Sequence, residues 1–241
     1  MRPRRAAMLT RFDWERAAGL VLHFLWPLSC PVCGRLGSPL CRECLLGLVG
    51  AEPGRTSCSE CLGPYPCPNH PGAFPVRSLT SFGGLPRELV HRLKYGSLKC
   101  LGKPLGDLMG RRFQPPGRVI LVPVPLHRGS GRAFNQSLEI ARGISREWGC
   151  AVAEKLAWKA RRPSQVGLSP GLRKKLPQGS IAWKGAIDKG LPVVLVDDVC
   201  TTGATLRVAA GAVRAAGGRV AGALVWALAG APCTGAGGGL H

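Results

Sequence analysis

The stretch from residue 193 to residue 205, VVLVDDVCTTGAT, constrains the fold of this chain more than any other. Its leading aliphatic residues predict a strand that is buried on both faces, as in a parallel sheet covered by helices. The Ala-rich segment 206–216, which has no proline, predicts a helix after it. A strand, a Thr/Gly loop and a helix N-terminus together form an anion site, because the first turn of a helix has unpaired N–H groups. Gly203 would let the backbone approach a phosphate.

Two carboxylates, Asp197 and Asp198, follow the strand directly. They would repel a phosphate, but carboxylates accept hydrogen bonds well from the vicinal diol of a ribose. The segment therefore predicts a site for a ribose 5-phosphate, with the diol on the Asp pair and the phosphate on the Thr201–Thr205 loop. The alternative is a strand end whose two Asp residues cap a turn. Neither G-x-x-x-x-G-K-[ST] nor G-x-G-x-x-G occurs in the loop, which excludes those two nucleotide-binding patterns.

The rest of the second half alternates strands and helices, which predicts an α/β fold with a parallel central sheet and ligands at the carboxyl ends of its strands. The aliphatic run 119–122 predicts a second buried strand, and Pro123–Arg128 would lie at its end. Further strands are expected at 76–82, 151–156 and 220–228, and further helices at 86–95, 101–113 and from residue 136 to Trp148.

The charge of the chain favours polyanionic partners. Its 241 residues include 33 Lys and Arg against 13 Asp and Glu, a formal net charge of +20. Biased codon usage is the alternative source of this charge, because Arg, Ala, Gly and Pro are all abundant. The sharpest basic region lies between Glu154 and Asp188, where eight basic residues occur and no acidic one.

Seven of the eleven cysteines lie between Cys30 and Cys67, in paired C-x-x-C spacing. This spacing is typical of zinc ligands, and reduced thiolates fit a cytoplasmic protein. His70 would replace a fourth thiolate in the second set, and the spacing leaves open whether the pairs close sequentially or cross over. Reduced surface cysteines are the alternative. The candidate ligands are Cys30, Cys33, Cys41 and Cys44 in the first set, and Cys58, Cys61, Cys67 and His70 in the second.

No transmembrane segment is expected, because the apolar run 19–28 is shorter than the ~20 residues that a spanning helix needs. The predicted organisation is a basic, amphipathic helix in 1–29, a double zinc-ribbon module in 30–74, a ligand-binding α/β domain in 75–230 and a flexible tail in 231–241.

Four motifs occur in one order behind the paired cysteines: PVPLH at 123–127, RAFNQ at 132–136, RRPSQ at 161–165 and the Asp-Asp loop. The Asp-Asp loop resembles the phosphoribosyl pyrophosphate (PRPP) signature of type I phosphoribosyltransferases. The whole arrangement resembles the ComF family, competence-type proteins with a double zinc ribbon before a phosphoribosyltransferase domain. The resemblance implies a type I phosphoribosyltransferase fold and PRPP as the ligand. Some members of the family have a role in the uptake of transforming DNA, so the resemblance also implies this role.

The resemblance also implies roles for individual residues. Asp197, Asp198 and Arg132 would be the catalytic residues, with Arg132 on a flexible hood over pyrophosphate and Mg²⁺ bridging pyrophosphate and diol oxygens. Two departures from the family are Ala133, where Gly is usual, and the absence of Asn after the basic residues 173–175. The implied PRPP-binding residues are Pro123, Val124, Pro125, Arg132, Asp197, Asp198, Thr201, Thr202, Gly203, Ala204 and Thr205.

Two functions are compatible with these features. The first is an enzyme, a phosphoribosyltransferase that displaces pyrophosphate from PRPP with an acceptor. The second is a non-catalytic accessory protein that keeps the PRPP fold and binds single-stranded DNA or a DNA-uptake helicase through its basic surface. The sequence shows no acceptor specificity and no N-terminal glutaminase nucleophile, because Arg2 follows residue 1.

Overall fold

The structure of the protein is a computed structural model that describes residues 29–50, 54–95, 98–127, 129–159 and 176–229. The chain divides into two compact units, Met1–Cys44 and Leu45–His241. Several predictions lie outside the described residues: the N-terminal helix up to residue 28, the basic residues at 161–162 and 173–175, the RRPSQ motif and the tail at 231–241.

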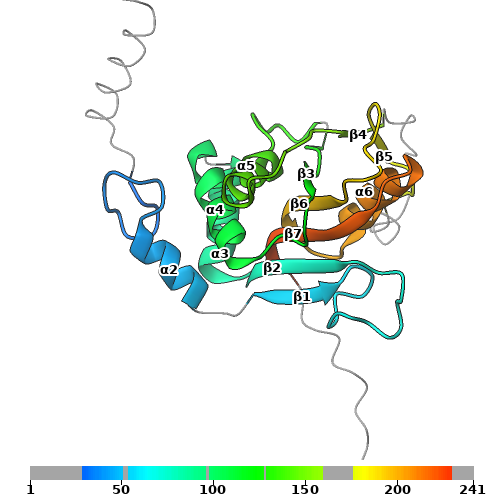
Figure 1. The fold of residues 1–241 in the computed structure, drawn as a ribbon. Helices are drawn as coiled ribbons and strands as arrows, with labels where there is room; N and C mark the ends of the chain where they lie inside the picture. Colours follow the sequence, from blue (N-terminus) through cyan, green and yellow to red (C-terminus); the bar gives the residue numbers. More distant parts are fainter. Residues whose placement is uncertain (1–28, 51–53, 96–97, 128, 160–175, 230–241) are drawn as a thin grey trace, which may run out of the picture. The chain divides into compact units, whose positions relative to one another are not determined.

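The described elements alternate between helices and strands over most of the chain (Figure 1). In order they are α2 (Arg42–Gly50), β1 (Arg55–Cys58), β2 (Pro75–Ser81), α3 (Gly84–Tyr95), a 3-10 turn η1 (Lys99–Leu101), α4 (Gly102–Arg112), β3 (Ile120–Pro123), α5 (Gln136–Trp148), β4 (Leu156–Trp158), β5 (Ile181–Trp183), β6 (Val193–Cys200), α6 (Ala204–Ala215) and β7 (Val220–Leu228). None of these helices has both the length and the apolar character needed to cross a bilayer.

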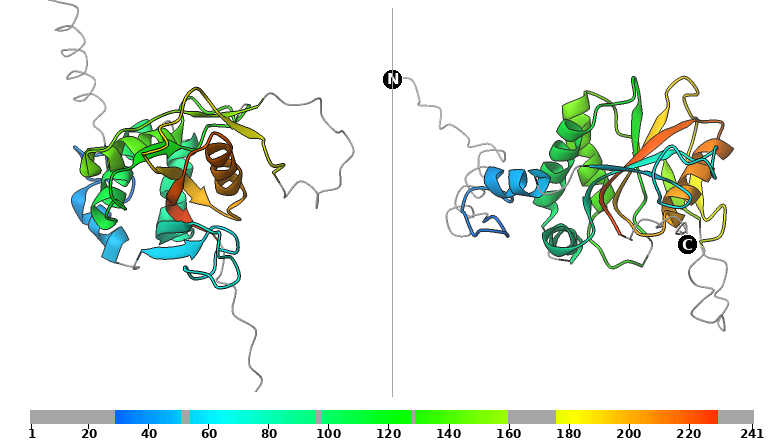
Figure 2. Two further views of the ribbon diagram at one scale, coloured as in Figure 1. Left: turned by 45° about the vertical axis from the view of Figure 1, so that its right-hand side comes forward. Right: turned by 90° about the horizontal axis from the view of Figure 1, so that it is seen from below.

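The second unit is built on a five-stranded sheet with the order β1-β2-β7-β6-β3. All neighbouring strands are parallel except the edge pair of β1 and β2. The helices α3, α4 and α5 lie on one face of the sheet and α6 lies on the other (Figures 1 and 2). The prediction of an α/β fold with a parallel central sheet is therefore confirmed, and the architecture is consistent with a type I phosphoribosyltransferase-like fold behind a Cys-rich N-terminal cluster.

The centre of the sheet is apolar on both faces, as the run Val193–Val196 predicts. All four of these residues are buried in β6, and the neighbouring β7 is buried from Gly222 to Leu228. A strand in the middle of a parallel sheet has helices on both sides, so it needs apolar residues at every position rather than at alternate ones.

The strand predicted at 151–156 is wrong in its extent. Only Val152 forms a bridge to the main sheet, beside Leu121 of β3, and the true strand β4 pairs antiparallel with β5 in a separate two-stranded sheet. The Leu121 N–H donates to the Ala151 carbonyl and the Leu121 carbonyl accepts from Ala153. The next donor along β3 would be residue 123, which is a proline without an N–H, so the ladder stops there.

The Asp pair lies within β6 rather than after it, because β7 pairs with β6 as far as Cys200. On the other side β3 pairs only up to Val196. Asp197 and Asp198 therefore lie in a part of β6 that has a strand on one side only. The helix α6 also begins earlier than predicted, at Ala204 instead of Leu206, so the last residues of the loop form the first helical turn.

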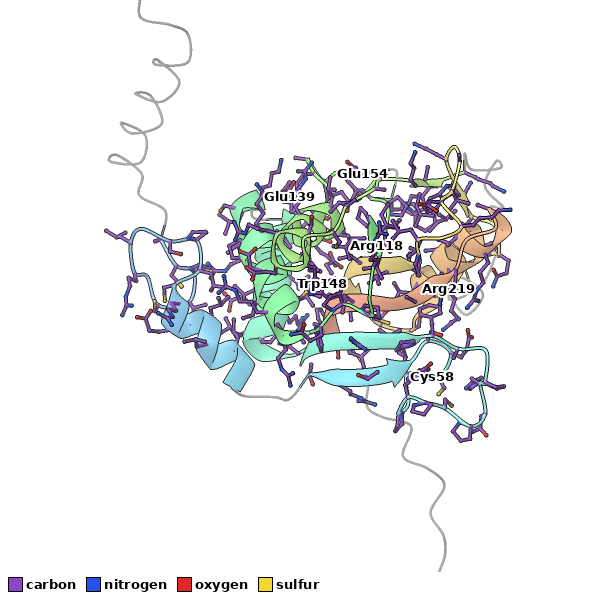
Figure 3. All side chains as sticks on the ribbon, in the orientation of Figure 1. Cys58, Arg118, Glu139, Trp148, Glu154 and Arg219 are labelled. Atoms are coloured by element: carbon purple, nitrogen blue, oxygen red, sulfur yellow. The ribbon has the colours of Figure 1, made fainter. Side chains whose placement is uncertain are left out.

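The strand β1 was not predicted, and it changes the setting of the second cysteine set. Its four residues pair antiparallel with β2, from Arg55 opposite Ser78 to Cys58 opposite Pro75. Cys58 thus lies where the edge strand of the sheet runs into the Cys-rich loop (Figure 3). The first cysteine set belongs to the first compact unit and the second set belongs to the second unit.

The helices α4 and α5 approach each other through glycines, and this contact holds α5 against the sheet. A Cβ at Gly106 would overlap the Ile140 carbonyl oxygen and lie 2.9 Å from the Gly143 Cα. We expect Gly106→Ala to lower the free energy of unfolding by about 2 kcal/mol or more, because the two backbones have to separate. Urea unfolding followed by far-ultraviolet circular dichroism measures this change.

Gly211 in α6 is the matched control, since it is also a helical glycine. A Cβ there meets only the Gln178 Oε1 at 3.4 Å, an ordinary contact. Gly211→Ala should be neutral or stabilise the protein by up to ~1 kcal/mol, because alanine favours helix. Equal destabilisation by both substitutions would contradict the close approach of α4 and α5.

Candidate active site

A cavity of about 450 Å³ lies at the carboxyl ends of β3 and β6. The end of α3, the start of α5, the loop before α6 and the β4–β5 sheet also contribute to its walls. Residues from distant parts of the sequence therefore line this cavity. The predicted site residues that line it are Val124, Pro125, Arg132, Asp197, Asp198, Thr201 and Thr205, whereas Pro123, Thr202, Gly203 and Ala204 lie outside its lining.

The two carboxylates of the Asp pair have different partners. Asp198 is buried, and its Oδ1 lies 2.9 Å from the Lys94 ammonium at the end of α3. Asp197 is half-buried, and its Oδ1 accepts a hydrogen bond of 2.8 Å from the Ser137 hydroxyl in α5. The same oxygen accepts from the Asp198 backbone N–H at 2.9 Å. Each carboxylate is thus held by a different helix.

The enclosed position of Asp197 and the adjacent Asp198 carboxylate raise the pKa of Asp197 to about 7. The Ser137 hydroxyl, the Asp198 N–H and the Lys94 charge oppose this rise and do not cancel it. Two adjacent carboxylates, of which only Asp198 forms an ion pair with Lys94, favour a single negative charge at neutral pH. A ligand that brings positive charge or hydrogen-bond donors to the pair would favour the second charge.

This raised pKa gives a test by pH. The folded state keeps the proton on Asp197 up to about pH 7, whereas the unfolded chain releases it near pH 3.8. The contribution of protonated Asp197 to the free energy of unfolding is therefore fully present below about pH 4 and is lost as the pH rises to about 7. Between pH 5 and pH 7.5 the free energy of unfolding of the wild-type protein should fall by about 1 kcal/mol or more relative to that of Asp197→Asn. Urea unfolding at each pH measures both free energies.

The exposed Asp188, whose carboxylate accepts from the Gly190 N–H of its own turn, is the control for this comparison. Asp188→Asn should follow the wild-type curve at every pH. If Asp197→Asn did the same, Asp197 would titrate at its ordinary pKa.

The start of α5 is anchored to the β3 end of the cavity by Asn135. Its side chain accepts from the Ser137 N–H at 3.1 Å as the N-cap of the helix. Its Nδ2 donates to the Val124 carbonyl at 3.0 Å. One residue therefore caps the helix that carries Ser137 and also holds the loop that follows β3.

Arg132 and Gln136 present donors to the cavity. The Arg132 Nη1 donates to the Gln136 Oε1 at 3.2 Å, and the guanidinium lies 5.7 Å from the centre of the Tyr95 ring. The Gln136 side chain is only 1% exposed. Its Nε2 and the Arg132 Nε have no hydrogen-bond partner within the described residues. Both nitrogens are enclosed by protein, so the charges of Arg132 and Lys94 in the cavity lining are what suits a ligand rich in acceptor oxygens.

The β4–β5 sheet supplies a partly apolar wall. The Trp158 Nε1 donates to the Pro125 carbonyl at 2.9 Å, which holds this sheet against the loop after β3. His127 lies edge-on to the Trp158 ring, with 4.9 Å between the ring centres. Phe82, Leu126 and Leu176 also line the cavity.

The Thr201–Thr205 loop leads into α6 through Gly203, the N-cap, which has a φ of 72°. A Cβ at Gly203 would lie 2.8 Å from the Ser59 carbonyl oxygen, so glycine is needed for both its conformation and its space. The Thr202 Oγ1 accepts from the Ala204 N–H at 3.4 Å. Thr201 and Thr205 face the cavity, so the N-terminus of α6 lies at its edge.

Cys200, which lies between the Asp pair and this loop, is poorly suited to act as a nucleophile. Its side chain is buried, and burial and the Asp197 charge raise the pKa of the thiol to about 11. The thiolate is therefore scarce at neutral pH.

The first cysteine set forms a compact cluster in the first unit, with all four sulfur atoms within 4.8 Å of one another. The Cys33 and Cys41 sulfurs are 3.5 Å apart, close to the ~3.8 Å edge that Zn–S bonds of ~2.3 Å give in a tetrahedron. Burial opposes ionisation of Cys30, but hydrogen bonds from the backbone N–H groups of Cys41, Cys33 and Val32 lower its pKa to about 6. The cluster is suited to a structural metal such as zinc.

The second set forms a separate cluster of Cys58, Cys61, Cys67 and His70, also within 4.8 Å. The Cys61 and Cys67 sulfurs are 3.8 Å apart, and the His70 Nδ1 lies 3.3 Å from the Cys67 sulfur. These distances also match a tetrahedral ion. In each cluster the ligands come from two consecutive pairs along the chain, so the pairs do not cross over. The spacing alone had left this open.

Lys94 and Ser137 are site residues that the sequence did not predict. Lys94 follows Leu89, Val90 and Leu93, the buried face of α3, and no local pattern shows that its ammonium reaches β6. Ser137 lies one residue beyond the RAFNQ motif, and its role depends on packing between α5 and β6. The one available signal was Asn135 as a helix N-cap, which places Ser137 in the first turn.

Neither the models of known protein families nor the curated proteins contain a match to this chain.

Proposed function

We propose that this protein binds PRPP and transfers its phosphoribosyl group to an acceptor, with release of pyrophosphate. The observation that carries the proposal is the cavity itself. At one edge of a parallel sheet it combines a pair of adjacent carboxylates, a Thr-lined helix N-terminus and several cationic or hydrogen-bond-donating side chains. The order of the motifs, which resembles the ComF family, supports the same function.

In this proposal the Asp197 and Asp198 carboxylates accept hydrogen bonds from the 2- and 3-hydroxyls of the ribose. The 5-phosphate lies against the Thr201–Thr205 loop and the N-terminus of α6. Arg132 and the loop from Pro123 to Pro125 face the pyrophosphate. Mg²⁺, bound with PRPP, would neutralise phosphate charge, and the carboxylates and phosphate oxygens are the hard oxygen ligands it prefers.

The chemical step breaks the bond between the anomeric carbon and the pyrophosphate oxygen, and forms a bond from that carbon to the acceptor. The electron pair of the broken bond leaves with pyrophosphate, and the acceptor loses a proton to solvent or to a nearby base. Donors on the leaving group and carboxylates beneath the ribose would both stabilise a transition state in which positive charge develops on the sugar. Phe82, Leu126, Trp158 and Leu176 are the surfaces available for the acceptor.

The test is release of pyrophosphate from PRPP and Mg²⁺ in the presence of ammonia, simple amines, and purine or pyrimidine bases. At least one acceptor should raise the rate above that of PRPP alone, and Arg132→Ala should abolish the increase. PRPP binding without release by any acceptor would favour the alternative of a non-catalytic accessory protein. Failure to bind PRPP by calorimetry would contradict the transferase and leave the accessory protein, which needs only the fold.

For the metal clusters, we propose zinc as the ion. Zinc accepts four-thiolate and three-thiolate-one-imidazole sets, and it needs no open coordination position in a structural site. The role of each ion would be to hold a short loop that has little apolar core of its own.

A further inference from the structure

Arg207 joins the second cysteine cluster to the loop before α6. It lies in the first turns of α6, and its side chain is 26% exposed. Its Nη1 lies 2.9 Å from the Thr202 carbonyl oxygen and 2.9 Å from the Ser59 carbonyl oxygen. The same nitrogen lies 3.3 Å from the Glu60 carbonyl oxygen, and the Nε lies 3.5 Å from the Glu60 carboxylate. One guanidinium thus connects the two loops.

Ser59 and Glu60 are the two residues between the metal ligands Cys58 and Cys61. Their conformation is set by a tight turn. The Leu62 N–H donates to the Cys58 carbonyl at 2.9 Å, and the Glu60 N–H points to the Cys58 sulfur at 3.4 Å. An ion held by both cysteines would fix the two carbonyl groups that Arg207 contacts.

The two loops also touch directly at Gly203. The position of a Cβ there would be 2.8 Å from the Ser59 carbonyl oxygen and 3.5 Å from the Leu62 side chain. The Ser59 N–H and hydroxyl are in turn bonded to the backbone of Phe74, at 3.1 Å each. The loop before α6 therefore has the cysteine turn as its support on the side away from the cavity.

We propose that a metal ion at the Cys58-Cys61-Cys67-His70 cluster and a phosphate ligand at the Thr201–Thr205 loop bind cooperatively, with Arg207 as the positioning residue between them. The ligand part rests on the proposed function. Ordering of the cysteine turn by the ion orders the Thr202 carbonyl and Gly203, and with them the N–H groups at the start of α6. Coupling of two binding sites is reciprocal, so the phosphate ligand strengthens metal binding by the same factor as the ion strengthens phosphate binding.

The experiment measures metal affinity with and without ribose 5-phosphate in the full chain. Co²⁺ is the probe, because its absorption distinguishes a three-thiolate-one-imidazole site from a four-thiolate site. Saturating ribose 5-phosphate should tighten Co²⁺ binding at the second cluster about tenfold, within the usual range of coupling between sites. In Arg207→Gln this factor should fall below about twofold.

Arg214→Gln is the matched control. Arg214 lies in the last turn of the same helix and also reaches the Cys-rich loop, where its Nη2 is 3.5 Å from the Gly72 carbonyl oxygen. Within the part of the chain that the structure describes, Arg214 makes no hydrogen bond or ion pair with the loop before α6. Its coupling factor should therefore equal that of the wild type. Arg207→Lys keeps the charge with fewer N–H donors, and it should give an intermediate factor even if Arg207→Gln does not fold.

The outcomes separate this inference from the proposed function. If neither ribose 5-phosphate nor inorganic phosphate bound the wild-type protein, the proposed function would fall, and the inference with it. If ribose 5-phosphate bound but left Co²⁺ affinity unchanged, the inference alone would be overturned. If Arg207→Gln weakened phosphate binding while the coupling factor stayed at its wild-type value, Arg207 would act only through its charge, and the inference would be overturned.

Discussion

Replacing Asp197 and Asp198 together with alanine should weaken PRPP binding a hundredfold or more and leave the binding of inorganic phosphate intact. The substitutions remove the acceptors for the ribose hydroxyls, and hydrogen bonds to charged groups contribute roughly 1.5–3 kcal/mol each. Two of them correspond to at least a hundredfold, because ~1.4 kcal/mol is a factor of ten. Inorganic phosphate never contacts the diol site, and it should bind no worse once the negative charge of the Asp pair is gone. Calorimetry with PRPP, ribose 5-phosphate and phosphate measures the three affinities.

The ion pair of Asp198 with Lys94 requires a control for folding. The double variant leaves the Lys94 ammonium, whose side chain is 18% exposed, without its carboxylate. Thermal unfolding therefore accompanies each titration, and Asp188→Ala is the surface control with an unchanged affinity for all three ligands. Equal losses for all three ligands would mean that the loop had collapsed. Unchanged PRPP affinity would show that the carboxylates do not bind the diol.

Metal analysis should find two zinc ions per chain, and loss of the second should destabilise the sheet-bearing unit by several kcal/mol. Structural zinc contributes to folding directly, with apparent binding free energies of ~10–16 kcal/mol in small zinc domains. Cys67→Ser should lower the zinc content to one and shift the unfolding transition of Leu45–His241, since Cys58 of the same cluster ends β1. Calorimetric scans and elemental analysis provide the two measurements.

Cys41→Ser is the counterpart in the first cluster. It should also remove one zinc ion, but the main unfolding transition should stay in place, because this cluster belongs to the separate unit Met1–Cys44. A folded protein that carried no zinc after purification would contradict the structural role of both clusters.

Local sequence determined much of the architecture. The aliphatic run before the Asp pair predicted a central strand, because only a strand covered on both faces needs four consecutive apolar residues. The last strand, β7, matches the predicted 220–228 in full. The helices α3, α4 and α5 lie within two residues of the predicted bounds. The C-x-x-C spacing predicted both cysteine clusters, since ligands with two residues between them share one turn.

Other features were decided by partners that are distant in the sequence. The Asp pair lies in β6 because β7 continues beside it, and the strand expected at 151–156 is interrupted because Pro123 lacks the N–H for another bond. The four residues of β1 form a strand only because β2 lies beside them.

The candidate site shows the same division. The sequence by itself predicted the Asp pair and the Thr201–Thr205 loop, because motifs of adjacent residues carry their chemistry with them, and Arg132 followed from the family resemblance. Tertiary structure alone brought Lys94 to Asp198, Ser137 to Asp197 and Arg207 to the cysteine turn. Single side chains on helices give no sign of which strand or loop they will reach, because that depends on how the helices pack. The raised pKa of Asp197 also depends on the tertiary structure, because burial and the charges around a carboxylate exist only in the folded chain.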